Sequence, residues 1–181
     1  MTSHIRDINL WESGNLKISW VRSHMPLLKG IEEDFLRTKP FDGLKIALSV
    51  HMEAKTARLC LCLAAGGAEM YATGCNPLST QDDVAAALVH EGLHVFAVHG
   101  ATMEEYENDL REVLKVGPNI IIDDGGDLVA RMHGKYPELL RNVIGSCEET
   151  TTGIHRLYAR ERKGALPCAM MAVNELRDFP R

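Results

Sequence analysis

The segment Asn119-Ile-Ile-Ile-Asp-Asp-Gly-Gly-Asp127 joins a short apolar run to two adjacent carboxylates and a pair of glycines. Similar apolar runs recur roughly every 25 residues and alternate with helical stretches, which is typical of βα units in a parallel sheet. The runs begin near Leu44, Glu69, His94, Asn119, Asn142 and Pro167. The repeated pattern predicts an α/β fold with a doubly wound, mostly parallel, Rossmann-like sheet of about six strands.

Reactive polar side chains follow most of these runs. They are His51, Cys75-Asn76, His99, Asp123-Asp124, Glu148-Glu149 and Asn174. Ligands of open parallel sheets bind in the crevice outside the carboxyl ends of the strands, so we expect a ligand site at this edge. Gly125 and Gly126 would let a ligand approach the backbone there, and Thr150 to Thr152 would offer donors at a helix start. In the competing interpretation, the carboxylates only cap helices, as a single pair would do.

The rest of the chain predicts a single domain over residues 1–181. The first 40 residues form two amphipathic helices, separated at His24-Met25-Pro26. Residues 41–174 hold the βα units, and residues 175–181 form a tail. Within the βα units we expect helices over Lys55–Ala65 and Glu149–Lys163, a helix with Ser79 as its N-cap, and a capping box over Thr102–Glu105.

The composition excludes several classes of function. The chain has 181 residues and a net charge of −5, so it has no basic surface for nucleic acid. No apolar stretch approaches the roughly 20 residues that span a bilayer, and the first residues lack the apolar core of a signal peptide. The five cysteines are an odd number and favour reduced thiols. We therefore expect a cytoplasmic protein that binds neither nucleic acid nor membranes.

The segment His90-Glu-Gly-Leu-His94 matches the zinc-protease pattern His-Glu-x-x-His. That site needs both histidines one turn apart on one helix. Here Gly92 interrupts the helix and His94 begins a strand, so we expect no metal site. Packing is the favoured role of Cys75 and Cys147, which stand at strand ends. No glycine-rich phosphate loop is present, so no dinucleotide site follows from local sequence.

Four longer segments carry a resemblance to a known family. They are His51-Met-Glu-Ala-Lys-Thr-Ala57, Cys75-Asn-Pro-Leu-Ser-Thr-Gln-Asp-Asp-Val-Ala85, Ile122-Asp-Asp-Gly-Gly-Asp-Leu128 and Glu148-Glu-Thr-Thr-Thr-Gly153. From about Asp7 to Asn174 the chain resembles the substrate domain of S-adenosyl-L-homocysteine hydrolase. The resemblance implies that a tightly held NAD oxidises the ribose 3′-hydroxyl, which acidifies the C4′ proton. Homocysteine then leaves by elimination, water adds, and the hydride returns.

The resemblance also implies roles for individual residues. Asp124 would serve the C4′ proton transfer, His51 would act near the 5′ leaving group, and Glu149 would bind the ribose hydroxyls. The residues expected to face the nicotinamide ribose of NAD are Thr150, Thr151, Thr152 and Asn174. The expected substrate-binding residues are Glu53, Lys55 and Thr56.

The sequence departs from the family pattern at the expected base-binding residues. Members that read adenine usually carry Thr and Glu where Glu53 and Lys55 stand here. A Glu accepts a hydrogen bond from a 6-amino group, whereas a Lys only donates and so suits a 6-keto oxygen. We therefore expect the site to accept hypoxanthine, as the similar His-x-Glu-Ala-Lys segment of archaeal-type members suggests. The alternative is that Lys55 pairs with Glu53 and does not contact the base.

A second departure lies after Asn174, where the family has a catalytic Lys and the NAD-binding domain. Here Glu175-Leu-Arg-Asp-Phe-Pro-Arg181 follows, with Phe179 near the expected Lys. We expect the isolated chain not to bind NAD and to be inactive, with a separate NAD-domain chain as a possible partner. The alternatives are a non-catalytic nucleoside-binding module and a truncated remnant of the enzyme. The resemblance further implies a homo-oligomer.

Overall fold

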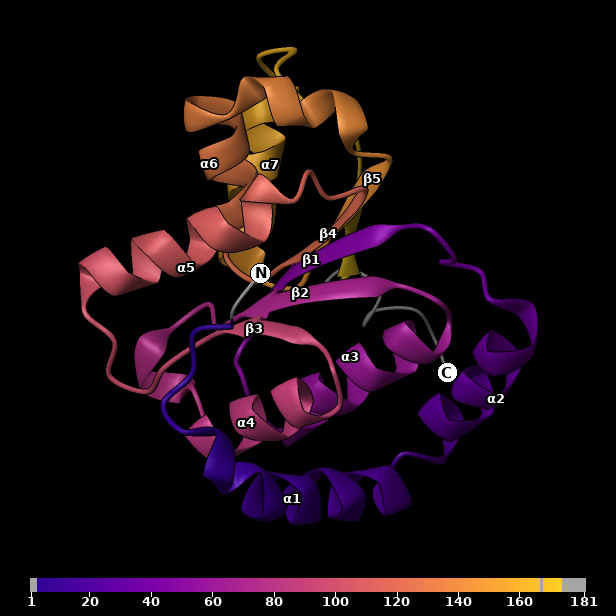
Figure 1. Ribbon diagram of the computed structural model, residues 1–181. Coiled ribbons are helices and arrows are strands. Elements are labelled where there is room, and N and C mark those ends of the chain that lie inside the picture. Colours follow the sequence, from indigo (N-terminus) through magenta and orange to yellow (C-terminus); the bar gives the residue numbers. More distant parts are fainter. Residues whose placement is uncertain (1–2, 167, 174–181) are drawn as a thin grey trace.

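The computed structural model describes residues 3–166 and 168–173. Its strands form one sheet in the order β3-β2-β1-β4-β5-β6, and every neighbouring pair is parallel (Figure 1). The strands are Lys45–Ser49 (β1), Glu69–Thr73 (β2), His94–Phe96 (β3), Ile120–Asp123 (β4), Gly145–Glu148 (β5) and Ala169–Ala172 (β6). The predicted doubly wound α/β fold is confirmed. Pro167, near which the sixth run begins, lies outside the described residues.

Helices cover both faces of this sheet. They are Trp11–His24 (α1), Pro26–Thr38 (α2), Ala54–Ala65 (α3), Asp82–His90 (α4), Met103–Lys115 (α5), Asp127–Lys135 (α6) and Thr151–Glu161 (α7). Figure 1 shows α3 and α4 below the sheet and α5, α6 and α7 above it. The two predicted N-terminal helices, α1 and α2, pack against α3 and α4 and form an outer layer.

The sheet separates two apolar cores, and alternation along the strands assigns each side chain to one of them. In β1, Ile46 and Leu48 enter the core beneath α3 and α4, whereas Ala47 faces the core beneath α5 and α6. All three side chains are buried, as expected for a strand covered on both faces.

Local signals account for several helix boundaries. The Thr102–Glu105 capping box is present at the start of α5, and Gly66 caps the end of α3. The helix before β3 ends at His90, and Gly92 follows with φ +91°, so the two histidines of the rejected zinc motif lie on different elements. His90 is exposed at the end of α4, and its ring stacks on Trp11 with centroids 3.8 Å apart.

Three predicted boundaries are wrong. Ser79 ends a 3₁₀ turn, Pro77–Ser79, and Gln81 is the N-cap residue of α4. Residues Pro137–Asn142 form another 3₁₀ helix, so β5 begins at Gly145 rather than near Asn142. The last helix spans Thr151–Glu161 instead of Glu149–Lys163, because the Thr150 side chain caps it by accepting from Gly153 N–H. Within the described residues, no helix is both long and apolar enough to cross a membrane.

Candidate functional site

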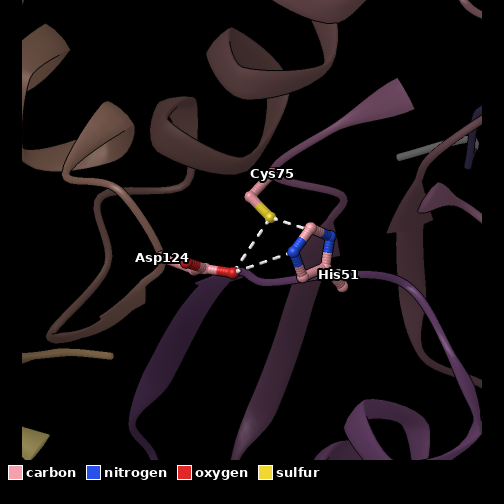
Figure 2. Close-up of side chains that lie close together, drawn as sticks. All are labelled: His51, Cys75 and Asp124. Atoms are coloured by element: carbon pink, nitrogen blue, oxygen red, sulfur yellow. Dashed lines mark hydrogen bonds and ion pairs between the residues drawn. The ribbon is translucent and has the colours of Figure 1, made fainter. Parts of the chain in front are cut away.

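Three side chains from three strand ends meet at the carboxyl edge of the sheet. His51 follows β1, Cys75 follows β2 and Asp124 follows β4, and these strands are neighbours in the order β2-β1-β4 (Figure 2). The last residues of the strands are in register, with Ser49 paired to both Thr73 and Asp123. The chain reverses its winding direction between β1 and β4, where α/β sheets form their ligand crevice. The predicted edge therefore brings His51 and Asp124 together.

The contacts within this group centre on one carboxylate oxygen. Cys75 Sγ donates to Asp124 Oδ2 at 3.1 Å, and His51 Nε2 lies 3.6 Å from the same oxygen. Cys75 Sγ is also 3.5 Å from His51 Nδ1. The Asp124 side chain is only 5% exposed, whereas that of His51 is 51% exposed. The group thus combines a buried carboxylate with an exposed imidazole. A ligand can reach the imidazole from solvent.

Ser79 determines which nitrogen of His51 carries a proton when the ring is neutral. The Ser79 hydroxyl donates its only hydrogen to the Asn76 carbonyl oxygen at 2.9 Å. Its oxygen lies 2.6 Å from His51 Nδ1 and can therefore only accept there. The Nδ1 atom is the donor, and the Nε2 lone pair faces Asp124. The residue expected to cap a helix instead orients the imidazole.

Burial raises the pKa of two side chains at this edge, Cys75 and Asp123. Burial, together with the Asp124 carboxylate, raises the pKa of the Cys75 thiol well above its ordinary range. Asp123 is fully buried, and that burial raises its pKa to about 7 despite the hydrogen bond from Val129 N–H. The Asp123 carboxylate accepts from the backbone N–H groups of Val129 at 3.1 Å and Asp124 at 3.2 Å. It holds the turn into α6 and does not face the ligand edge.

Glu148 has a similar supporting role at the end of β5. Its Oε1 accepts from Gly125 N–H, Thr150 N–H and the Thr150 hydroxyl, each at 2.9 Å. The side chain is buried against Gly153, where an added Cβ would lie 2.1 Å from Glu148 Cδ. Glu148 therefore joins the loop after Asp124 to the start of α7 and leaves Glu149 as the exposed acid of the pair.

A cavity of about 500 Å³ lies beside the start of α3 and is lined by Glu53, Lys55 and Gln81 together with residues of α1. Glu53 caps α3 by accepting from the backbone N–H of Lys55 at 3.1 Å. Within the described residues, the Lys55 ammonium forms no ion pair with Glu53 or any other acid. The alternative Lys55–Glu53 ion pair is thus absent from the described part of the chain, and contact of Lys55 with the base stays a prediction.

Lys17 of α1 orients the amide of Gln81 at this cavity. Its ammonium donates to Gln81 Oε1 and to Asp83 Oδ1, both at 3.0 Å. The Lys17 contact fixes which end of the amide carries the oxygen, so the Gln81 NH₂ group lies at the other end and can donate to a ligand. The Gln81 backbone N–H donates to the Met52 carbonyl oxygen at 2.9 Å, which holds the start of α4 next to His51.

The other predicted site residues lie at the same edge in different environments. Glu149, Thr151 and Thr152 are exposed there, whereas Thr150 is engaged by Glu148. Thr56 is buried in the first turn of α3. His99 holds the loop before α4, with its Nδ1 2.9 Å from the Thr80 carbonyl oxygen. Asn174 and the tail 175–181 lie outside the described residues.

Sequence reasoning missed Cys75, Ser79, Gln81 and Lys17 as parts of the site. Cys75 stands at a strand end beside Asn76, so its position was the available signal, but packing was the favoured role. Ser79 and Gln81 precede a helix, where such residues are usually caps. Lys17 has no local signal, because its partner is 64 residues away in the sequence.

The comparisons with known proteins agree with these segments. The family model described as "S-adenosyl-L-homocysteine hydrolase" matches residues 2–134 and 129–176. The chain is 55% identical over 171 residues to the S-inosyl-L-homocysteine hydrolase of Methanocaldococcus jannaschii, covering 94% of this chain and 41% of that protein. It is 48% identical to the adenosylhomocysteinase of Pyrococcus abyssi, covering 94% of this chain and 40% of that protein.

A third relative, the S-inosyl-L-homocysteine hydrolase of Methanopyrus kandleri, is 50% identical and covers 96% of this chain and 41% of its own length. The chain thus spans about two fifths of the length of the curated relatives that it matches. The match extends over nearly all of this sequence and includes the segments that form the site. The chain belongs to the S-adenosyl-L-homocysteine hydrolase family.

Proposed function

We propose that this chain, as a single domain over residues 1–181, is the nucleoside-binding half of an S-nucleosyl-L-homocysteine hydrolase, with a preference for hypoxanthine over adenine. The carrying observation is the meeting of His51, Cys75 and Asp124 beside the cavity lined by Glu53 and Lys55. The relatives named for S-inosyl-L-homocysteine and for S-adenosyl-L-homocysteine support the thioether nucleoside as the substrate class.

In the proposed reaction, the bond between homocysteine sulfur and the 5′ carbon of the nucleoside breaks, and water supplies the 5′ oxygen. Asp124 would take the C4′ proton and return it, because its buried carboxylate is held in place by the Cys75 thiol. His51 would hold a proton at the departing sulfur and at the entering oxygen. Its exposure and the Ser79 contact at Nδ1 support this role, since they leave Nε2 to exchange the proton.

Glu149 is the proposed ligand of the ribose hydroxyls. Its backbone N–H donates to the Asp123 carbonyl oxygen at 3.0 Å, which fixes the residue one strand away from Asp124. The exposed carboxylate can accept from two vicinal hydroxyl groups at once. Glu148 supports this arrangement through the loop at Gly125 and does not contact the ribose itself.

NAD would supply the acceptor for the hydride of the ribose 3′ carbon. Thr151 and Thr152 would contact it, because both are exposed in the first turn of α7, where N–H groups and hydroxyls can meet a polar ligand. Asn174 would complete this contact. We propose that this chain does not hold NAD alone and that a separate NAD-domain polypeptide, or the remainder of a longer protein, binds most of it.

The family relationship and the free thiols support a proposal for the compartment and the oligomeric state of the enzyme. All five cysteines are free, as expected for the reducing cytoplasm, where we propose that the protein acts. We also propose that it forms a homo-oligomer, which the exposed apolar side chains of Ile144 and Met171 support. A non-catalytic nucleoside-binding module, including a truncated remnant of the enzyme, is the second candidate, because it would use the same pocket.

The base preference is tested by exchanging the charge at Lys55. We expect inosine to bind about tenfold more tightly than adenosine, because the ammonium can donate to the 6-keto oxygen but not to a 6-amino group. In Lys55→Glu the preference should reverse, as a carboxylate accepts from the amino group. Isothermal titration calorimetry with both nucleosides measures the change.

Lys29→Glu is the matched control, since Lys29 is an exposed lysine of α2 that does not line the cavity. It should retain the inosine preference of the natural protein. A clear adenosine preference in the natural protein that disappears in Lys55→Glu would contradict the assignment of the base. Failure of both nucleosides to bind would contradict the proposed pocket as a whole.

A further inference from the structure

We propose that His51, Cys75 and Asp124 form a binding site for a thiophilic divalent cation of the zinc class. The three residues offer an imidazole nitrogen, a sulfur and a carboxylate oxygen that all lie within 4.8 Å of one another. Sequence reasoning gave no metal site because it considered only the His90–His94 motif. A site assembled from three strand ends has no such local signature.

The distances match those that a tetrahedral zinc ion imposes on its ligands. Zinc binds sulfur at about 2.3 Å and nitrogen or oxygen at about 2.0 to 2.2 Å, which places neighbouring ligand atoms about 3.4 to 3.6 Å apart. Here His51 Nε2 is 3.6 Å and Cys75 Sγ is 3.1 Å from Asp124 Oδ2. Cys75 Sγ lies 3.5 Å from Nδ1 of the same imidazole, and the three ligand atoms all lie within 4.8 Å of one another, so small side-chain rotations would bring them to zinc distances, with water in the fourth position.

The orientation of His51 also suits a metal ligand. Its Nδ1–H donates to Ser79, so the Nε2 lone pair points toward the Asp124 carboxylate. Two electron-rich atoms then face each other with no hydrogen between them, an arrangement that a cation stabilises. Ligating histidines typically have their second ring nitrogen held in this manner.

The charge around the group favours a cation over an anion. Within the described residues, no Lys or Arg pairs with Asp124, and the basic side chain beside it is the neutral imidazole of His51. The buried carboxylates of Asp123 and Glu148 lie at the neighbouring strand ends. On binding, Cys75 would release its S–H proton to solvent and coordinate as a thiolate. One sulfur, one imidazole and one carboxylate suit zinc rather than magnesium or calcium, which prefer oxygen ligands.

The cation would occupy the space proposed for the substrate ribose. We therefore expect metal and nucleoside to exclude each other, a consequence that rests on the proposed function. Metal binding itself does not depend on that function. The two are measured separately, by a metal spectrum in the absence of nucleoside and by nucleoside calorimetry in the absence of metal.

Cobalt(II) chloride, added to the reduced full chain under argon, is the probe. We expect visible d–d bands typical of tetrahedral cobalt and a near-ultraviolet thiolate-to-cobalt charge-transfer band, both removed when zinc chloride is added. Cys75→Ser should abolish the charge-transfer band and weaken the cobalt affinity at least about tenfold. Ser79→Ala should weaken it by about tenfold, because it frees the ring that Ser79 holds.

Cys147→Ser is the control, since Cys147 is another half-buried cysteine at a strand end and should leave both bands unchanged. Circular dichroism checks that each variant is folded. If Cys75→Ser is unfolded, Asp124→Asn, which keeps the side-chain shape, should weaken cobalt binding instead. The proposal is overturned if the natural protein gives no charge-transfer band, or if the band survives in folded Cys75→Ser or Asp124→Asn with unchanged affinity.

The nucleoside arm separates the two proposals. Saturating inosine should raise the apparent dissociation constant of cobalt. Cobalt binding without inosine binding would contradict the proposed function and leave the metal site standing. Inosine binding without the cobalt spectrum would contradict the metal site alone.

Discussion

At the scale of the residue, adjacent carboxylates at this edge have different roles. Asp123 and Glu148 are buried and hold backbone N–H groups, whereas Asp124 contacts Cys75 and His51 and Glu149 is exposed. Successive side chains of an extended segment point in opposite directions, so one member of each pair turns inward. Asp123 and Glu148 therefore hold backbone groups, as the helix-capping interpretation expects, and ligand binding by Asp124 and Glu149 stays a prediction.

Gly153 makes the position of Glu148 testable. A methyl group at Gly153 would lie 2.1 Å from Glu148 Cδ and would displace the carboxylate from Gly125 and Thr150. We expect Gly153→Ala to lower the free energy of unfolding by about 2 kcal/mol or more, through overpacking and the loss of buried hydrogen bonds. Urea titration followed by circular dichroism measures the change.

The matched control is Gly30→Ala in α2, where nothing lies within 4 Å of the added Cβ. That substitution should raise the free energy of unfolding by about 0.5 to 1 kcal/mol, because alanine favours a helix. Equal stabilities of the two variants would mean that Glu148 can shift without cost.

At the scale of the element, α2 is attached to α3 through a buried ion pair. Arg58 of α3 is 1% exposed and donates to both carboxylate oxygens of Glu32 of α2, at 2.6 and 2.7 Å. Arg22 of α1 also donates to Glu32 at 3.0 Å. The outer helical layer thus depends on one carboxylate at the junction of three helices.

This pair predicts a stability that falls in acid. The hydrogen bonds and charge of Arg58 hold the pKa of the Glu32 carboxyl below its ordinary value. A carboxyl whose pKa is lower in the folded state stabilises the fold above the unfolded pKa and loses this contribution as the pH falls through the folded pKa. The free energy of unfolding should therefore decrease below about pH 4.5, in the range where Glu32 titrates.

Glu32→Gln should flatten this acid dependence, which urea titrations across the pH range would show. It should also cost about 3 kcal/mol at neutral pH, because Arg58 would stay buried without a countercharge. Glu33→Gln, at the exposed neighbouring position, should change neither property. If the free energy of unfolding of Glu32→Gln fell in acid as steeply as that of the natural protein, other carboxyls would be responsible for the pH dependence.

At the scale of the whole molecule, the sheet order brings distant segments to one edge. His51, Cys75 and Asp124 are separated by 24 and 49 residues along the chain, yet they follow neighbouring strands. The order β2-β1-β4 arises because the chain returns across β1 after β3. This crossing creates the crevice, and the proposed NAD-binding half would have to close over it.

The proposal that this chain does not hold NAD alone predicts that the pure chain does not turn over substrate. With S-inosyl-L-homocysteine or S-adenosyl-L-homocysteine and NAD, the pure chain should release no homocysteine, as a thiol assay would show. Addition of an NAD-domain polypeptide from a relative should restore release if the chain is half of an enzyme, whereas a non-catalytic module would stay inactive. Light scattering on the same samples reports the homo-oligomer. Release by the chain alone would contradict the need for a second part.

The sequence predicted the boundaries of some elements well and those of others poorly. The apolar runs at Leu44, Glu69 and His94 gave strands close to their predicted starts, because a buried parallel strand is a continuous apolar segment. The capping box at Thr102 and the stop at Gly66 were also confirmed, since both depend on residues close in sequence. The start of β5 was misplaced because Val143 and Ile144 are apolar and extend the run toward Asn142, whereas Val143 N–H closes the preceding 3₁₀ helix on the Leu140 carbonyl oxygen.

The sequence by itself determined the alternation of strands and helices, the edge that bears the polar groups and the family. These properties follow from short-range patterns and from contiguous motifs. Only the tertiary structure decided that Cys75 and Ser79 join His51, that Lys17 orients Gln81, and that Glu53 accepts from the backbone N–H of Lys55. Those contacts join residues whose side-chain directions depend on the order and packing of separate elements, and no local pattern encodes that arrangement.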